Sequence, residues 1–511
     1  MKSTVHRTQL AAAVTLAVFS QVSLADRPKD FGAWVQHQLH AHSERLFGIK
    51  EPLDASAPET AENYRTASQG AHDQLLLAKG LKAEYVTREA ADSTDMMVFW
   101  PLGKKPTHLI TAVEESSPSK IGTLPSGIDK LTPSVQRIDL ETGKPETILR
   151  GLAAADGIRL TPWGTILITE ETSSGGAYEI LDPLNVTNHT VTDRATGTVV
   201  DADGTPSTKV VKRNALPTMA WEGIGVLKNG VVLAGDELRP GTPDDADGGA
   251  IFKFIPTTPY EASAGPLTDL AQSPFTAGKL YALQTSCVDD KQQFGQGCEI
   301  GNGVWIPVNA ATARADADSK GATGFYRPED LEIDPVYADA AYPHAVRFCW
   351  ANTGNADARN YGEVLCGVDT EPLVTSFIDA GGATQAKRTT TINRFLEGDA
   401  DLNQPDNIAF QPGTGNLFVI EDNANGDVWS CLPDGVDRDI KSDGCVKVLS
   451  VKDSSAEPTG LIFSASGKTA YLTVQHSGDA NMPLVDDYST DDVIRIKRFD
   501  VMVHDKDIGK N

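Results

Sequence analysis

The chain has 511 residues, of which 70 are acidic and 45 basic, giving a formal net charge of −25. Contacts to phosphate backbones require clustered Lys and Arg, so this balance argues against nucleic acid or an anionic membrane surface as a partner. A surplus of carboxylates keeps a protein soluble. It also supplies the oxygen ligands that hard cations such as calcium prefer.

The N-terminus has the features of an export signal. Lys2 and Arg7 precede a mostly apolar stretch over residues 10–22, and residues 23–25 (Ser-Leu-Ala) form a cleavage site before Asp26. The apolar stretch is too short to span a bilayer, and no later segment is long enough. We therefore predict a periplasmic or secreted protein without a membrane span. Its basic region lacks an Arg-Arg pair, which favours export of the unfolded chain.

Residues 26–90 are expected to form an N-terminal extension. Phe31, Val35 and Leu39 recur at helical spacing, which predicts an amphipathic helix over Lys29 to Phe47. The following segment, Glu51 to Gly70, contains Ala, Pro and Ser and is interpreted as a loop that wraps around the body of the protein.

Residues 91–511 are dominated by short predicted strands separated by Gly, Pro, Asn and Asp. No alternation of strands with helices is present, so the sequence predicts an all-β fold. The candidate strands are Met96–Trp100, His108–Ala112, Val135–Leu140, Ala177–Leu181, Ala250–Ile255, Glu363–Val368, Asp427–Leu432 and Val493–Asp500.

One short pattern recurs along this part of the chain: an acid, a small or polar residue, a strand, a turn and a second strand. A repeated unit of this size is typical of a solenoid or a propeller. In a propeller the first strand of each blade lines the central channel, so equivalent acids would converge at one channel mouth. The copies begin at Asp156, Glu222, Glu329 and Asp406, and a fifth copy at Thr459-Gly460 has its nearest acid at Glu457.

The acids at the ends of the second strands belong to the same face, because the two strands are antiparallel. Glu170 and Glu171 follow the strand that begins at Thr165, and Asp236-Glu237 and Glu421-Asp422 hold the same place in two further copies. Carboxylates crowded together raise one another's pKa values, and bound cations relieve that repulsion. The alternative interpretation is that these acids cap turns and pair with nearby Arg.

The six cysteines form three sequential pairs with short separations. In an oxidising compartment this spacing predicts the disulfides Cys287–Cys298, Cys349–Cys366 and Cys431–Cys445, although six cysteines permit other pairings.

Several blocks of the sequence resemble the PhoX-type alkaline phosphatases. The block Thr161-Pro162-Trp163-Gly164-Thr165 followed by Thr169-Glu170-Glu171 is the most specific of them. The later blocks are Arg327-Pro328-Glu329, Pro405-Asp406-Asn407, Glu457-Pro458-Thr459-Gly460 and Val474 to Gly478. The resemblance implies a six-bladed β-propeller, an exported protein, and a cluster of iron and calcium at the channel mouth that hydrolyses phosphate monoesters.

The resemblance also assigns roles to individual residues. It implies that Arg327 binds the phosphate of the substrate. The metal ligands that it implies are Glu114, Glu170, Glu171, Glu222, Glu329, Asp406 and Glu457.

The sequence departs from the family pattern at the iron site. The family has a cysteine ligand before its paired acids, where this chain has Thr169, and an Asn-His pair before an acid, where this chain has Ala112 and Val113. A hydroxyl is a poor replacement for a thiolate on iron. Calcium is therefore the expected metal, and iron is not expected.

The sequence thus predicts an exported, calcium-dependent propeller hydrolase that acts on a small phosphate ester. Two alternatives remain open: a calcium-dependent lactonase-like hydrolase, and a non-catalytic, calcium-stabilised binding protein of the cell envelope.

Overall fold

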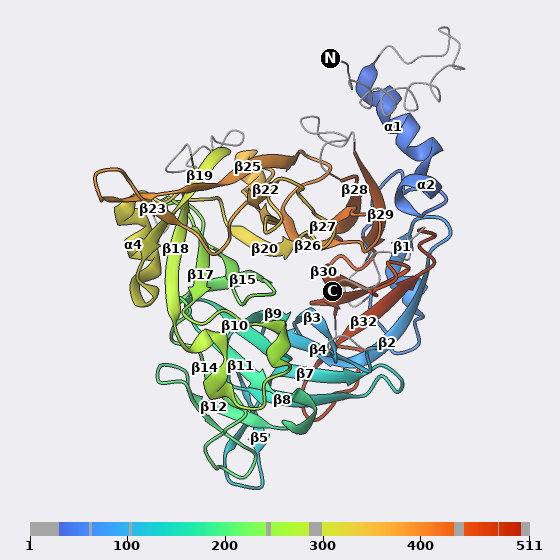
Figure 1. The fold of residues 1–511 in the computed structure, drawn as a ribbon. Helices are drawn as coiled ribbons and strands as arrows, with labels where there is room; N and C mark the ends of the chain where they lie inside the picture. The colour runs from blue at the N-terminus through green and yellow to red at the C-terminus, as the bar shows by residue number, and fades with distance from the viewer. Residues whose placement is uncertain are drawn as a thin grey trace.

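The structure is a computed structural model that describes residues 30–60, 64–101, 105–241, 247–285, 299–433, 444–478 and 480–501 (Figure 1). The expected signal segment lies outside these residues. Within them, no helix combines the length and the apolar character needed to cross a membrane.

Strands arranged around a central axis make up the body of the protein (Figure 1). The innermost strands contact one another in sequence order, and the last contacts the first, so the ring is closed. This ring consists of β3 (Thr94–Trp100), β9 (Ala155–Leu160), β15 (Met219–Val226), β20 (Pro328–Ile333), β26 (Pro405–Phe410) and β30 (Glu457–Phe463). The prediction of an all-β propeller is confirmed.

Each inner strand pairs with an antiparallel second strand, as the repeated pattern predicts. These second strands are β4 (His108–Val113), β10 (Thr165–Gly175), β16 (Val232–Asp236), β21 (Val346–Asn352), β27 (Leu417–Glu421) and β31 (Thr469–Gln475). The outer strands are β7 (Pro133–Asp139), β8 (Pro145–Arg150), β11 (Ala177–Leu181), β14 (Val210–Lys212), β17 (Ile251–Pro256), β18 (Gly278–Gln284), β22 (Glu363–Asp369), β25 (Arg388–Glu397), β28 (Asp427–Cys431), β29 (Cys445–Val451) and β32 (Thr490–Lys497).

The remaining elements lie in the connections between these strands. β19 (Gly301–Val308) pairs with both β18 and β25 and so joins two neighbouring blades. β12 (His189–Asp193) adds to β8, and β13 (Thr198–Val200) pairs with β12. The connections also contain two hairpins and the helix α4 (Ala313–Lys320). The hairpins are β5 (Lys120–Thr123) with β6 (Asp129–Leu131) and β23 (Ser376–Ile378) with β24 (Thr384–Ala386).

The N-terminal extension begins with two helices rather than the single predicted one. α1 (Phe31–Ala41) is capped by the side chain of Asp30, which accepts a hydrogen bond from the Ala33 amide at 3.1 Å. The helix breaks at His42, and α2 (Ser43–Phe47) ends at Gly48, whose φ of 70° is readily adopted by glycine.

Two strands of the extension complete blades at the other end of the chain. β1 (Leu75–Leu77), which follows the short helix α3 (Ala71–Gln74), pairs with β29. β2 (Lys82–Ala91) pairs with β32 from Lys82–Lys497 to Ala91–Thr490. The first and last parts of the chain are therefore held together in one sheet, and the expected domain boundary at residue 91 falls at the end of a propeller strand.

The segment before β1 packs against the outer strands of the same blades. The Ala57 amide donates to the hydroxyl of Ser450 at 2.8 Å, and the hydroxyl of Ser56 donates to Asp427 at 2.6 Å. Arg65 is fully buried and donates from Nη2 to Asp492 on β32 at 2.7 Å.

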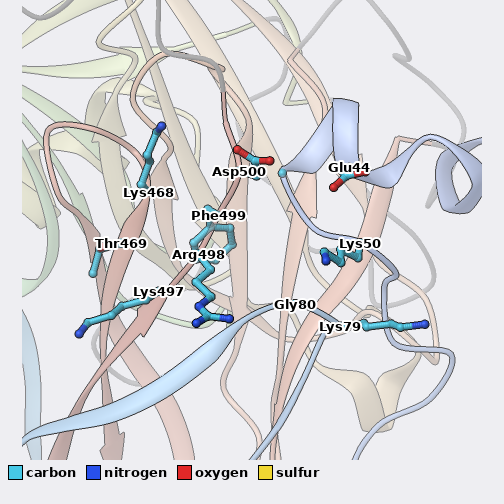
Figure 2. A pocket seen from close by; sticks show the side chains of 11 residues that line it. Glu44, Lys50, Lys79, Gly80, Lys468, Thr469, Lys497, Arg498, Phe499 and Asp500 are labelled. Carbon is cyan, nitrogen blue, oxygen red and sulfur yellow. The ribbon is translucent and has the colours of Figure 1, made fainter.

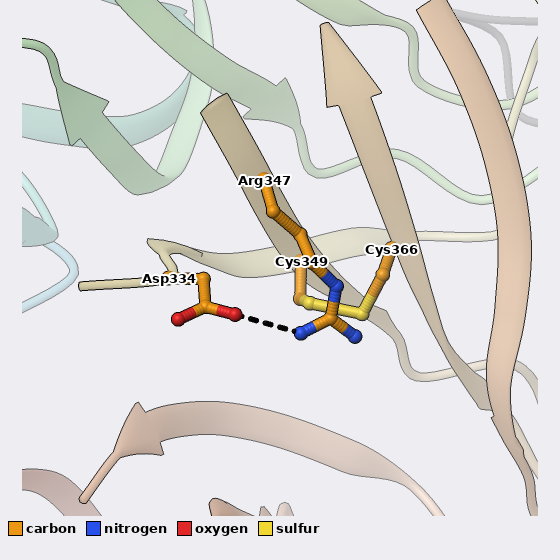
Figure 3. Close-up of a disulfide and its surroundings, with 4 residues drawn as sticks. All are labelled: Asp334, Arg347, Cys349 and Cys366. Carbon is orange, nitrogen blue, oxygen red and sulfur yellow. Dashed lines mark hydrogen bonds and ion pairs between the residues drawn. A yellow bond between two sulfur atoms is a disulfide. The ribbon is translucent and has the colours of Figure 1, made fainter. Parts of the chain in front are cut away.

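Two of the three predicted disulfides are present. Cys349 on β21 lies directly opposite Cys366 on β22, and Cys431 on β28 lies opposite Cys445 on β29, with Cα atoms 4.0 Å apart in both pairs. Opposed residues of antiparallel strands place their Cβ atoms within bonding reach of a disulfide. Figure 3 shows the first of these bonds beside the ion pair between Arg347 and Asp334. The predicted pair Cys287–Cys298 lies outside the described residues.

Candidate metal centre

A β-bulge occurs at the same point of each inner strand. In all six the pairing register shifts across a short interval, such as Trp221 to Ile224 in β15 and Pro405 to Ile408 in β26. A bulge redirects the side chains within it. In five of the six strands the first residue inside this interval is an acid: Asp95, Asp156, Glu222, Glu329 and Asp406. The repeated acids of the sequence are therefore the bulge residues of the ring.

The sixth inner strand has Gly460 inside its bulge instead of an acid. A Cβ atom at Gly460 would lie 2.4 Å from the carbonyl oxygen of Asp95, so no side chain fits at this position. Glu457, at the start of the same strand, provides the nearest carboxylate of this blade.

Two groups of carboxylates have the spacing of a metal site. Ligand atoms of Asp156, Glu171 and Glu222 lie within 4.8 Å of one another, and so do those of Glu222, Glu329 and Asp406. Glu222 belongs to both groups, which therefore form one continuous centre. Asp156 and Glu329 are each 1% exposed, and Glu222 is 4% exposed.

A second set of acids follows the ends of the second strands. Glu114 follows β4, Glu237 follows β16 and Asp422 follows β27, while Glu171 lies near the same point of β10. The side chain of Gln475 donates to Glu114 at 3.0 Å, and the ring of His476 lies 3.5 Å from Glu457. The two sets of acids together surround one end of the channel.

The guanidinium group of Arg327 lies among these acids and pairs with three of them. Its Nε contacts Glu237 and lies 2.9 Å from Glu329, and its Nη1 donates to Asp422 at 2.7 Å. The backbone of Arg327 has a φ of 62°, an uncommon conformation for a residue with a side chain and one that clusters at functional sites.

Burial, together with the crowding of carboxylates, raises the pKa values of these acids. Burial and then the charge of Asp156 raise the pKa of Glu222 well above its ordinary value, and burial raises the pKa of Asp156 to about 7. Burial and then the charge of Asp422 raise the pKa of Glu457 to about 8. At neutral pH the centre therefore cannot hold its full negative charge without additional cations.

The donors of the centre fit calcium. Calcium takes six to eight oxygen ligands, and the two groups of carboxylates supply oxygen alone. Both carboxylate oxygens of Asp156 are buried without a hydrogen-bond partner among the described residues. Such groups normally have a partner, and a bound cation would supply one.

The side chain at the expected iron site differs from the cysteine ligand of the family. Thr169 is fully buried, and its hydroxyl donates to the carbonyl oxygen of Gly157 at 3.0 Å. Its oxygen is engaged with the backbone of the neighbouring strand, and it is not a thiolate. The site therefore lacks the sulfur ligand of the family's iron centre.

The structure brings together most of the residues predicted from the sequence. Seven of the predicted site residues lie around the end of the channel: Glu114, Glu171, Glu222, Glu329, Asp406, Glu457 and Arg327.

Glu170 does not join the other predicted ligands. Its two oxygens accept hydrogen bonds from the amides of Ala153 and Gly176, both at 3.1 Å, and Arg194 lies 3.3 Å away. Glu170 therefore stabilises the turn beside β10. This is the turn-capping role expected as the alternative to metal binding.

Four further acids of the centre are not among the predicted ligands. Asp156, Glu237 and Asp422 are visible in the repeated pattern, since they hold the same positions as Glu222 and Glu171. Asp95 does not belong to any of the recognised copies of the repeat. The second strand after Asp95 is nevertheless followed by Glu114-Glu115, just as the second strand after Asp156 leads to Glu170-Glu171. That shared ending is the sequence signal that identifies it.

Solved structures with a similar arrangement share little sequence with this chain. A gluconolactonase from Xanthomonas campestris is 12% identical, with a TM-score of 0.37 over 88% of this chain and 98% of its own. The PQQ-bound aldose sugar dehydrogenase from Streptomyces coelicolor is 12% identical, with a TM-score of 0.37 over 83% of this chain and 100% of its own. A luciferin-regenerating enzyme is 8% identical, with a TM-score of 0.41 over 83% of this chain and 98% of its own.

No curated protein sequence matches the chain significantly. The sequence profile of the family described as alkaline phosphatase PhoX matches residues 154–478, which is more than half of the chain. The matched segment contains the acids of both carboxylate groups and Arg327. The chain therefore belongs to the PhoX alkaline phosphatase family.

Proposed function

We propose that the protein is an exported, calcium-dependent hydrolase of small phosphate esters. The observation that carries the proposal is the pair of carboxylate groups that share Glu222 at one end of the channel. Membership of the PhoX family supports a phosphatase-like reaction at this site.

The carboxylates of the ring would hold the metal. Asp156, Glu171 and Glu222 form one ligand group, and Glu329 and Asp406 complete the second with Glu222. When bound, calcium would neutralise the phosphate charge and polarise a phosphoryl oxygen. The same acids exclude competing anions when no cation is present, because their own charges repel a phosphate.

Arg327 would hold the substrate phosphate beside these ligands. Two of its nitrogens are engaged by Glu237, Glu329 and Asp422, which fixes the orientation of the guanidinium plane. Among the described residues, the hydrogen bonds of this side chain to other side chains come from Nε and Nη1, and none comes from the third nitrogen, Nη2. A guanidinium held in this way can direct its remaining N–H groups at an oxygen that gains charge during the reaction.

The proposal is tested with the purified protein, an aryl phosphate and a panel of lactones, each with added calcium and with chelator. We expect calcium-dependent hydrolysis of the aryl phosphate, which is lost in Glu222→Gln. Turnover of a lactone in place of the phosphate ester would favour the lactonase-like alternative. Tight calcium binding without turnover of either substrate would favour a non-catalytic binding protein.

A further inference from the structure

A basic pocket lies on the outside of the propeller, away from the acids of the channel. It forms where α2, the residues just after α2 and the turn after β1 meet the start of β31 and the end of β32, and it has a volume of about 500 Å³. Pockets that bind small molecules have volumes of this order. Figure 2 shows Arg498 and Phe499 between Lys50 and Lys79 on one side and Lys468 and Lys497 on the other.

The fold brings these cations together from separate segments of the chain. The Lys50 amide donates to the carbonyl oxygen of Lys79 at 3.0 Å, which joins two segments of the extension. Lys497 lies directly opposite Thr469, the residue after Lys468, in the pairing of β31 with β32. The Asp500 amide donates to the carbonyl oxygen of Gly48 at 2.8 Å. This bond joins the segment after β32 to the segment after α2.

Only part of this positive charge is neutralised by neighbouring acids. Lys79 pairs with Glu51 at 2.7 Å, and Lys497 pairs with Glu84 at 2.6 Å. Within the described chain, Lys50, Lys468 and Arg498 form no ion pair. The pocket is lined by two acids, Glu44 and Asp500, against its five cations.

The positive charge of this pocket contrasts with the negative charge of the whole protein. The whole chain carries a net charge of −25, so an excess of cations at one pocket is not a consequence of composition. Cations held close together repel one another, and a bound anion removes that repulsion. Lys and Arg donors around a concave surface are the groups that recognise phosphate.

We propose that this pocket binds a phosphate-bearing ligand at a site separate from the carboxylate ring. Lys50, Lys468 and Arg498 supply the charge-assisted hydrogen bonds, while the ring of Phe499 is buried against Phe418 and Phe463 and fixes the position of the neighbouring Arg498. The strong negative charge of the protein disfavours an anionic membrane, so a dissolved phosphate compound is the expected source of the phosphate group. The inference is independent of the proposed phosphatase activity.

Calorimetric titration of the full-length protein in chelator tests this site, because a channel centre without calcium repels the probe. The probe is methylenediphosphonate, whose P–C–P link is not hydrolysed, and vesicles of phosphatidylglycerol form the second arm. We expect saturable binding of the diphosphonate that weakens as salt is added. The double variant Lys50→Gln/Arg498→Gln should bind about tenfold more weakly or worse, since two charge-assisted contacts are lost.

Three matched variants test whether the diphosphonate binds in this pocket. Lys105→Gln removes an exposed lysine elsewhere and should leave the affinity unchanged. Glu44→Gln removes an acid from the pocket and should tighten binding. Arg327→Gln alters the channel site and should not affect the pocket.

Each outcome decides the proposal. Vesicle binding that is lost in the double variant, without diphosphonate binding, would keep the site and assign the phosphate to a lipid headgroup. Absence of binding in both arms overturns the proposal. Diphosphonate binding that survives in the double variant, or that is lost in Arg327→Gln, overturns it as well. Unchanged melting temperatures of the variants show that the pocket is intact in each.

Discussion

The hydroxyl of Thr169 donates to the carbonyl oxygen of Gly157, and this bond joins two strands of one blade beside the carboxylate ring. The space around it is tightly filled, because a Cβ atom at Gly157 would lie 2.7 Å from the Thr169 oxygen and 2.1 Å from the carbonyl oxygen of Glu222. The position that carries the iron ligand in the family is thus a structural contact here.

The first prediction is that the purified protein lacks stoichiometric iron and the visible colour of a ferric–thiolate centre. Elemental analysis and an absorption spectrum provide the measurement. Thr169→Cys alone should not restore the iron, because Ala112 and Val113 on β4 replace the other family residues. One iron per chain together with fast turnover of phosphate esters would contradict this prediction.

The second prediction compares two adjacent acids of β10. Glu171→Gln should weaken calcium binding and reduce the rise in melting temperature that calcium produces, since Glu171 belongs to a carboxylate group of the centre. Glu170→Gln should lower the melting temperature through its lost turn contacts but leave the calcium response intact. Calorimetry with and without chelator measures both effects. Equal calcium responses in the two variants would remove Glu171 from the site.

The third prediction concerns pH. The pKa of Asp156 rises from an ordinary 3.8 to about 7 in the folded protein, and that of Glu457 from 4.5 to about 8. The folded state therefore binds more protons than the unfolded state between these values, so stability is lost as the pH rises through them. In chelator, the free energy of unfolding should fall from about pH 4 to about pH 8.

Saturating calcium should flatten this dependence, because it stabilises the ionised carboxylates. Denaturant melts across the pH range measure the slope. A metal-free stability that rises with pH over this window would contradict the assignment of buried, crowded acids.

The sequence predicts the propeller and much of the carboxylate centre because one short pattern, an acid followed by two strands, repeats along the chain. Each acid occupies a bulge in an inner strand, so a short pattern marks both the strand and its carboxylate. Asp95 is missed because the predicted first strand begins at Met96, one residue after the acid. Glu170 and Glu171 are indistinguishable in sequence, and only the register of β10 separates a turn contact from a metal ligand.

Other features depend on long-range pairing that no local pattern contains. β1 and β2 look like part of a loop-rich extension, yet they complete blades formed by residues more than 370 positions later. The specific block around Trp163 is a turn: its indole donates to the buried Glu179 at 2.8 Å, so it supports the blade and is not part of the centre.

The fourth prediction concerns the attachment of the extension. Asp492 on β32 accepts hydrogen bonds from Arg65 and Arg88, and its side chain is fully buried. Asp492→Asn leaves two guanidinium groups without their counter-charge and should cost about 3 kcal/mol or more of unfolding free energy. Lys120→Gln, which breaks the exposed pair with Asp129, should cost less than about 1 kcal/mol. Denaturant melts compare the two, and similar small losses would show that the buried pair does not hold the extension.

The last prediction separates the role of Arg327 in the reaction from its role in the fold. Arg327→Gln should lower kcat/KM for an aryl phosphate about tenfold or more, because a charge-assisted contact to the phosphoryl group is lost. The same change removes a positive charge from beside Glu237, Glu329 and Asp422, so calcium affinity should stay equal or increase. The control is Arg347→Gln, which breaks the ion pair with Asp334 outside the carboxylate ring and should leave kcat/KM unchanged (Figure 3). If Arg327→Gln lowers calcium affinity and activity in parallel, Arg327 supports the metal ligands and does not bind the substrate.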